Sequence, residues 1–213
     1  MGFPAGAVPG VDVSHYQAHV DWEAVAGGGE RFAFAKASEG LTSSDTYFAD
    51  NWAGIKRAGL LRGAYHFYHP NSDPTQQAIH FLQALSKANG GSPRLAPGDL
   101  PAALDLEVTD GASTADLLAG AATWLAKVEA ATGKRPIVYT FVSFWRTTLG
   151  NPRGLADYPL WIAQLNVSAP ATIGGWTNWQ FWQFATQPLH GVSGAVDMDA
   201  FNGSYADLEA MAG

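Results

Sequence analysis

The feature that most constrains the fold is a series of short apolar segments, each bounded by glycine, proline or a helical pattern. Near-continuous apolar runs such as Phe32–Ala35 and Pro136–Tyr139 are typical of strands in a parallel sheet whose two faces are both covered. We therefore expect the following strands: Val11–Ser14, Phe32–Ala37, Arg62–Phe67, Ala102–Glu107, Pro136–Thr140, Leu160–Leu165, Gln180–Phe184 and Ala195–Phe201.

Helical patterns alternate with the first five of these segments. One apolar helical face runs through Phe48–Ile55 and stops at Gly59, which predicts the end of that helix. Two more helices are predicted to begin at Asp73-Pro74 and at Ser113, because Asp and Ser are favoured N-caps and proline is favoured in the first turn. The third of these helices should end at Gly133.

This rhythm predicts an α/β fold, and more closely a single TIM-like barrel of the (β/α)5β3 type. After about residue 158 the strands follow one another too closely for covering helices, so we expect eight strands but only about five helices. The 213 residues lie near the lower limit of roughly 200 for such a barrel. We therefore expect one domain over residues 1–213, with 1–9 as an N-terminal extension; an open, doubly wound sheet is the alternative.

Composition excludes several classes of partner and site. The net charge is −7, which argues against nucleic acid or an anionic membrane surface as the main partner. The chain has no cysteine, which excludes disulfides and thiolate metal sites. No apolar run is long enough to span a bilayer. Residues 1–9 lack the basic and apolar regions of a signal peptide, so either a signal was removed or none existed.

An acidic pair closes the fourth predicted strand. Asp105 and Glu107 are two residues apart, so in a strand both side chains lie on one face, with Leu104 and Leu106 on the other. Two neighbouring acids at the end of an apolar strand raise each other's pKa, and one of them can then act as a general acid near neutral pH. The alternative is a structural role, in which the two acids cap the next loop or pair with Arg or Lys.

Polar residues also gather at the ends of the other predicted strands, where the active sites of such barrels lie. They are Asp12, Lys36, Tyr65, His66, His69, Tyr139, Trp161, Gln164, Trp182, Gln183, Asp197 and Asp199. Each has a structural alternative: Asp12 could cap a turn, Tyr139 could belong to the core, and Asp197 could pair with Lys36. Aromatic rings beside amide and acid groups also suit a sugar-binding cleft.

Six short motifs occur in order along nearly the whole chain. They are Gly10–Ser14, Phe34–Gly40, Gly63–Phe67, Leu104–Glu107, Trp182-Gln183 and Val196–Asp199. Together they resemble the motifs of the family 25 glycoside hydrolases, the muramidase type of lysozyme. The resemblance implies a flattened eight-stranded barrel that hydrolyses the β-1,4 bond between N-acetylmuramic acid and N-acetylglucosamine in peptidoglycan.

The resemblance also implies roles for individual residues. Glu107 is the expected proton donor, Asp105 its partner, and Asp12 and Asp197 complete the acidic site. The expected substrate-binding residues are Lys36, Tyr65, Tyr139, Trp161 and Gln183. The close spacing of the acidic pair favours retention of configuration, with the substrate's own 2-acetamido oxygen attacking while Asp105 orients the amide.

We expect no cofactor and no metal, peptidoglycan as the partner, and action as a monomer. The location expected for such an enzyme is extracellular; the alternative is a cytoplasmic, phage-type lysin released at lysis. Three other functions stay open: a chitinase-like glycosidase, a glycan-binding barrel without activity, and a metal-dependent hydrolase that uses His66, His69 and Asp residues.

Overall fold

The computed structural model describes residues 3–4 and 6–213, so part of the expected extension 1–9 lies outside the described residues. The strands are β1 (Val8–Val13), β2 (Phe32–Glu39), β3 (Ser43–Ser44), β4 (Leu61–Phe67), β5 (Ala103–Asp105), β6 (Ile137–Phe141), β7 (Leu160–Ala163), β8 (Phe181–Pro188) and β9 (Ala195–Phe201). The helices are α1 (Trp22–Gly28), α2 (Phe48–Arg57), α3 (Pro74–Ala88), α4 (Thr114–Thr132), α5 (Tyr205–Ala212), a 3-10 turn at His15–Gln17 and a π-helix at Phe144–Thr148.

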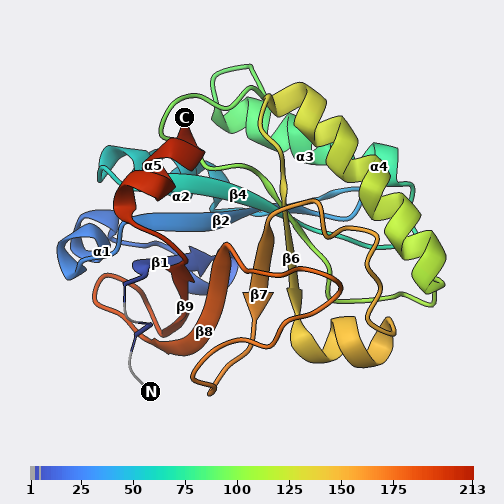
Figure 1. Ribbon diagram of the computed structural model, residues 1–213. Helices are drawn as coiled ribbons and strands as arrows, with labels where there is room; N and C mark the ends of the chain where they lie inside the picture. Colours follow the sequence, from blue (N-terminus) through green and yellow to red (C-terminus); the bar gives the residue numbers. More distant parts are fainter. Residues whose placement is uncertain (1–2, 5) are drawn as a thin grey trace.

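The strands form one closed barrel (Figure 1). The sheet order is β1-β9-β8-β7-β6-β5-β4-β2-β3, and an additional pairing of β1 with β2 joins the two ends. The short strand β3 pairs only with β2, so the other eight strands make the barrel. The predicted eight-stranded α/β barrel is confirmed, and the open sheet is excluded because β1 is paired on both sides.

The helices follow the predicted rhythm. Helices α1 to α4 each follow one of the first four barrel strands, and the π-helix follows β6. Loops alone join β7, β8 and β9, as the short spacing predicted. The predicted helix boundaries hold at Asp73, whose side chain accepts hydrogen bonds from the first turn of α3, and at Gly133, which caps α4 in the left-handed conformation.

Strand β9 departs from the parallel arrangement. It runs antiparallel to both β8 and β1, and Asp12 faces Asp197 in the β1–β9 register. An antiparallel strand reverses which of its ends lies at a given edge of the barrel. The start of β9 therefore lies at the edge where the parallel strands end.

Aromatic rings fill the barrel interior. Phe32 and Phe34 are completely buried, and Phe34 stacks on Trp161 with ring centroids 4.5 Å apart. Glycine makes room for these rings: a Cβ on Gly10 would lie 2.6 Å from Phe32, and one on Gly63 would lie 2.2 Å from Phe34. Gly10 therefore belongs inside β1, which begins earlier than the predicted Val11 because we had taken this glycine as a strand boundary.

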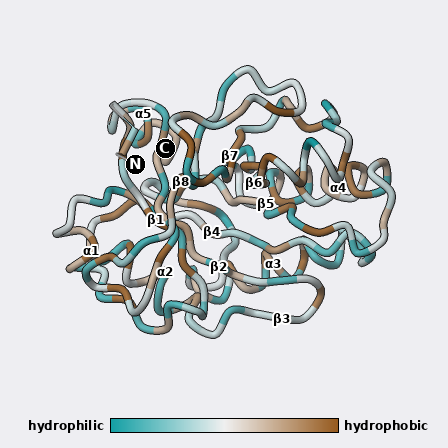
Figure 2. Tube along the Cα trace, turned by 90° about the horizontal axis from the view of Figure 1, so that it is seen from below, coloured by the Kyte–Doolittle hydropathy of each residue, from teal (hydrophilic) through white to brown (hydrophobic). Residues whose placement is uncertain are grey.

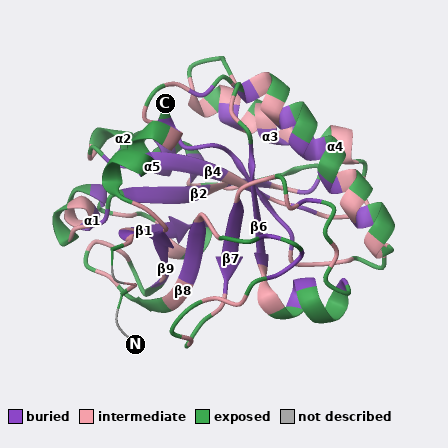
Figure 3. Cartoon of the chain, in the orientation of Figure 1, coloured by how far each residue is buried: buried purple, intermediate pink, exposed green. Residues whose placement is uncertain are grey.

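A second apolar layer lies between the barrel and its covering helices. Trp52 of α2, Phe81 of α3 and Trp124 of α4 are its largest buried side chains on those helices. In Figure 2, α3 and α4 alternate between hydrophobic and hydrophilic residues, and in Figure 3 their outer surfaces are exposed while the strands are buried. The helices are therefore amphipathic covers for a sheet that is apolar on both faces.

Helix α5 closes the barrel at the amino-terminal edge of its parallel strands. Its Leu208 and Ala212 join the interior cluster, and Gly98 donates a backbone hydrogen bond to Ala212. Within residues 3–4 and 6–213, no helix is both long enough and apolar enough to cross a membrane. The carboxyl-terminal edge is left open for a site.

Gly63→Ala should destabilise the protein by roughly 1–3 kcal/mol, because the added methyl group overpacks the interior against the Phe34 ring. Gly27→Ala in α1 is the matched control, since a Cβ there meets nothing within 4 Å. That control should be neutral or up to about 1 kcal/mol more stable, because alanine favours the helix. Urea unfolding measures both; equal stability of the Gly63 variant and the wild type would contradict this packing.

Candidate active site

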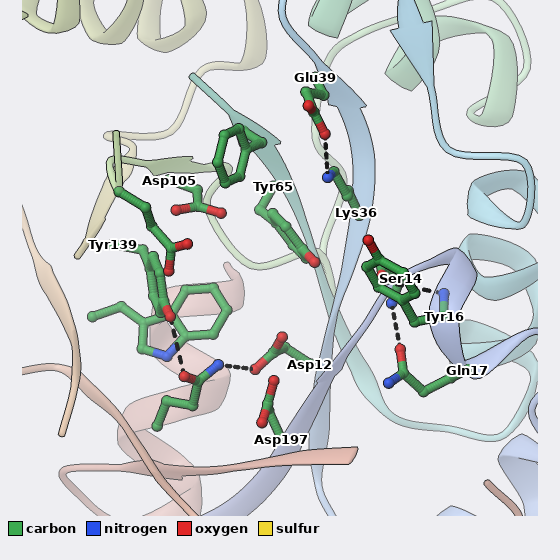
Figure 4. Close-up of a pocket in the computed structure, with 14 residues that line it drawn as sticks. Asp12, Ser14, Tyr16, Gln17, Lys36, Glu39, Tyr65, Asp105, Tyr139 and Asp197 are labelled. Atoms are coloured by element: carbon green, nitrogen blue, oxygen red, sulfur yellow. Dashed lines mark hydrogen bonds and ion pairs between the residues drawn. The ribbon is translucent and has the colours of Figure 1, made fainter. Parts of the chain in front are cut away.

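One cavity of about 480 Å³ opens at the carboxyl-terminal edge of the parallel strands (Figure 4). Every residue predicted for the site lines it, and the sequence motifs therefore meet in space: Asp12, Lys36, Tyr65, Asp105, Glu107, Tyr139, Trp161, Gln183 and Asp197. Ser14, Tyr16, Gln17, Glu39 and Phe67 complete the lining and were not among the predicted site residues.

The acidic pair lies as the alternation predicted. Strand β5 ends at Asp105, and the backbone N–H of Leu106 donates to Tyr139 O at 2.9 Å, so the chain stays beside β6 beyond the strand. Leu104 and Leu106 are buried in the layer under the helices, while Asp105 and Glu107 line the cavity. Glu107 is half-buried and Asp105 is buried, so Glu107 is the more accessible of the two acids.

Asp12 and Asp197 come from neighbouring antiparallel strands. Asp12 lies near the end of β1, whereas Asp197 lies near the start of β9. We had expected Asp197 at the end of its strand, and this was wrong, because it lies near the start. The expected edge of the barrel is correct, because β9 runs antiparallel and its start lies where the parallel strands end. The alternative pairing of Asp197 with Lys36 is not formed: Asp197 accepts a hydrogen bond from Thr186, and Lys36 pairs with Glu39 at 2.6 Å.

These carboxyl groups raise the pKa of one another. Burial, and then the charge of Asp197, raise the pKa of Asp12 to about 8. Burial and the charge of Glu107 raise the pKa of Asp105 well above its ordinary range. Burial and the charge of Asp197 also raise the pKa of Glu107, against the lowering effects of the neighbouring Tyr139 hydroxyl and of the charge of Lys36. The cavity therefore holds protons near neutral pH that isolated carboxyl groups would have lost.

A hydrogen-bonded chain fixes Asp12. The hydroxyl of Tyr139 donates to Gln183 Oε1 at 3.0 Å, and Gln183 Nε2 donates to Asp12 Oδ2 at 2.7 Å. In Figure 4 dashed lines mark these two hydrogen bonds, which lie between Tyr139 of β6 and Asp12 of β1. Tyr139 and Gln183 were predicted as substrate-binding residues; their contacts show that they hold the acidic site in place.

Asp199 is a buried carboxyl group that our predicted site set left out. It is completely buried, and the indole N–H of Trp161 donates to its Oδ1 at 2.8 Å. Burial and the charge of Asp12 raise its pKa well above the ordinary range, and among the described residues its Oδ2 atom is buried without a hydrogen-bond partner. The sequence signal was its spacing: two residues after Asp197, it lies on the same face of β9.

Trp161 is more deeply buried than its predicted role in substrate binding suggested. Only 2% of its surface is exposed, because its ring is stacked on Phe34 inside the barrel. It contributes to the cavity floor and orients Asp199 rather than presenting an open face. Tyr65, which is only partly buried, offers an aromatic surface nearer to the opening.

Comparison with known proteins decides the family. The family model described as Glycosyl hydrolases family 25 matches residues 11–191. The chain belongs to glycoside hydrolase family 25. It is 39% identical over 214 residues to Lysozyme M1 of Streptomyces globisporus, covering 96% of this chain and 71% of that protein.

Two further similarities agree with this family. The chain is 34% identical over 215 residues to the N,O-diacetylmuramidase of Arthroderma benhamiae, covering 98% of this chain and 88% of that protein. The crystal structure of the bacterial lysozyme from Streptomyces coelicolor matches with a TM-score of 0.88 and 38% identity, covering 98% of both chains. The family match ends at residue 191, and the barrel then adds Asp197 and Asp199 of β9 to the same site.

In this family 25 chain, the two histidines of the metal alternative do not meet at a common site. His66 is completely buried between Ser38 and Gln77, and burial lowers its pKa to about 3, so it is neutral. His69 instead contacts Asp110 at 2.7 Å and Glu39 at 3.2 Å. Among the described residues, no group of three or more His, Cys, Asp or Glu side chains is arranged to hold a metal ion.

Asp12→Asn should gain stability relative to the wild type as the pH rises from about 4 to about 8. The ordinary pKa of Asp is 3.8 and that of the folded Asp12 is about 8, so between these values the folded protein holds a proton that the unfolded chain releases. The wild type therefore loses stability across this window, whereas asparagine does not titrate.

Melting temperatures of both proteins at pH 4, 6 and 8 measure this effect, and the difference between the two chains removes titrations that they share. Asp50→Asn, on the exposed side of α2, is the matched control for losing one carboxyl group. A difference between Asp12→Asn and the wild type that stays constant from pH 4 to pH 8 would show that folding does not raise the pKa of Asp12.

Proposed function

We propose that this protein is a muramidase-type lysozyme, which hydrolyses the β-1,4 bond between N-acetylmuramic acid and N-acetylglucosamine in bacterial peptidoglycan. The observation that carries the proposal is one cavity in which Asp12, Asp105, Glu107 and Asp197 meet in a family 25 chain. The similarity to proteins named lysozyme and N,O-diacetylmuramidase supports the choice of substrate.

Glu107 is the proposed proton donor to the leaving oxygen. It is more accessible than Asp105, and burial and the charge of Asp197 raise its pKa, which favours the protonated form that a general acid needs. Asp105 and Glu107 repel each other when both are ionised. The pair therefore retains one proton to a higher pH than either acid alone would. With that proton on Glu107, Asp105 is the ionised partner.

The ionised carboxylates have a second role in the proposed reaction. Positive charge develops on the sugar in an oxocarbenium-like transition state, and fixed negative charge stabilises that state more than the neutral substrate. Asp197 accepts a hydrogen bond from Thr186, so little reorganisation of this carboxylate is needed when the charge appears. Asp12, whose pKa is raised to about 8, keeps its proton near neutral pH and contributes this negative charge only at higher pH. Asp105 is proposed to orient the substrate's 2-acetamido group, whose oxygen attacks the anomeric carbon.

The proposed substrate lies outside the cytoplasmic membrane of bacteria. We therefore propose that the protein acts there, whether secreted or released at lysis, and that it is antimicrobial toward bacteria whose wall it cleaves. It is proposed to act as a monomer on a single glycan strand. The four acids of the proposed site meet within one chain, so the proposed reaction needs no residue from a second copy.

Glu107→Gln should lower the rate of peptidoglycan cleavage by roughly 10²–10⁴-fold, because the amide cannot donate the proton. Asp105→Asn should also be severely impaired, without loss of stability, because it removes a buried repulsion. Glu209→Gln, exposed on α5, is the control for removing one carboxyl group. Activity is measured by mass spectrometry of the soluble products from purified bacterial peptidoglycan.

The products of this reaction also distinguish between the candidate functions. Fragments with reducing-end N-acetylmuramic acid from the wild type support a muramidase, and reducing-end N-acetylglucosamine would indicate a glucosaminidase. Cleavage of chitin alone would favour the chitinase-like alternative. Binding without any cleavage would favour an inactive glycan-binding barrel, and full activity of Glu107→Gln would overturn the assigned donor.

The β-anomer of the new reducing end should appear first, because attack by the 2-acetamido oxygen followed by water inverts the anomeric carbon twice. Proton NMR recorded in the first minutes of the reaction, before the anomers equilibrate, measures this. The α-anomer as first product would mean direct attack by water and would exclude substrate assistance.

A further inference from the structure

The most exposed large hydrophobic side chain among the described residues is Tyr16, with 81% of its surface exposed. It nevertheless belongs to the lining of the cavity. It buries too little apolar surface to stabilise the fold appreciably, since hydrophobic stabilisation follows the area removed from water. Among the hydrogen bonds of the described residues, none involves its hydroxyl group, so packing and polar contacts leave this side chain without a structural role.

The backbone that carries Tyr16 is firmly held on both sides. Ser14 and Gln17 form a reciprocal capping box around the 3-10 turn, and Gln17 Nε2 also donates to Ala195 O at 3.2 Å, which ties the turn to β9. Asp45, whose side chain is 1% exposed, accepts from the His15 backbone N–H at 2.8 Å and contacts the His15 ring at 3.1 Å. The sequence thus fixes a segment whose central side chain faces solvent.

The neighbouring ring supports Tyr16 from one side. The centroids of His15 and Tyr16 are 4.2 Å apart and their planes are inclined by 34°. A ring with few rotatable bonds, placed on a fixed turn, offers a flat contact surface at a low entropic cost. Binding to such a surface therefore loses less free energy to side-chain ordering than binding to a mobile side chain.

The position of Tyr16 separates it from the reacting groups. In Figure 4, Tyr16 and Gln17 lie at one end of the cavity and Tyr139 and Asp105 at the other, with Asp12 and Asp197 between them. A ligand that contacts Tyr16 while its scissile bond lies beside Glu107 must extend across the cavity. A glycan strand has this length, and its sugar rings present apolar C–H faces that pack on aromatic rings.

We propose that Tyr16 is the stacking platform of a distal sugar subsite, which binds a ring of the glycan strand remote from the cleaved bond. This inference rests on the proposed function and adds a residue that selects long strands over short ones. Tyr16 touches no reacting atom, so its contact is the same in the ground state and in the transition state. Such uniform binding lowers KM without changing kcat.

Tyr16→Ala should therefore raise KM for long, soluble peptidoglycan strands by about tenfold, a typical effect of losing one well-placed aromatic contact. The kcat on these strands, and both constants on the shortest oligosaccharide that the wild type cleaves, should stay unchanged. Tyr16→Trp should restore the KM, because it keeps a flat ring. Initial rates against substrate concentration on the two substrates measure these quantities.

Tyr205→Ala is the matched control, because Tyr205 is 38% exposed on α5 at the opposite edge of the barrel. It should leave KM unchanged on both substrates. Circular dichroism and the melting temperature check that each variant is folded.

Each outcome has a distinct meaning. If the wild type cleaves both substrates and Tyr16→Ala has the same KM on long strands, the distal subsite is wrong while the proposed function stands. A fall in kcat, or an equal loss on short oligosaccharides, would place Tyr16 in the reacting geometry and also overturn the proposal. Failure of the wild type to cleave either substrate would reject the proposed function itself.

Discussion

The site depends on the pairing of β1 with two partners. This strand runs parallel to β2 on one side and antiparallel to β9 on the other, and it thereby joins the two ends of the sheet. Closure places Asp12, near the beginning of the chain, opposite Asp197, near its end. It also encloses the aromatic interior that forms the cavity floor through Trp161. Without this pairing neither the floor nor the acidic cavity above it would exist.

The acidic cavity opposes the stability of the barrel that contains it. Asp12, Asp105 and Asp199 are buried, and each has its pKa raised because ionising it there costs free energy. The apolar interior and the layer under the helices offset that cost. Repulsion that would be a defect in an ordinary core keeps protons on acids near neutral pH, which is the condition for acid catalysis.

Periodicity and glycine positions predicted much of this molecule. The eight barrel strands, the caps of α3 and α4, and the common face of Asp105 and Glu107 all follow from local spacing, since side-chain direction in a strand is set by the backbone alone. Local spacing could not show that β9 runs antiparallel, because its own alternation is the same in either direction. Local spacing also could not place Gly10 inside a strand. The Phe32 ring of β2 leaves no room for a Cβ at this position, and the two residues meet only in the folded barrel.

The sequence by itself determined which chemistry is present: acids at strand ends, aromatics among them, and motifs of a glycosidase family in order. Only the tertiary structure decided how each group is used. Trp161 is turned inward by stacking on Phe34 and orients Asp199, whereas Tyr16 is turned outward on a turn fixed by Ser14, Gln17 and Asp45. The physical reason is that burial and hydrogen-bond partners come from segments far apart in the chain, and these meet only when the barrel closes.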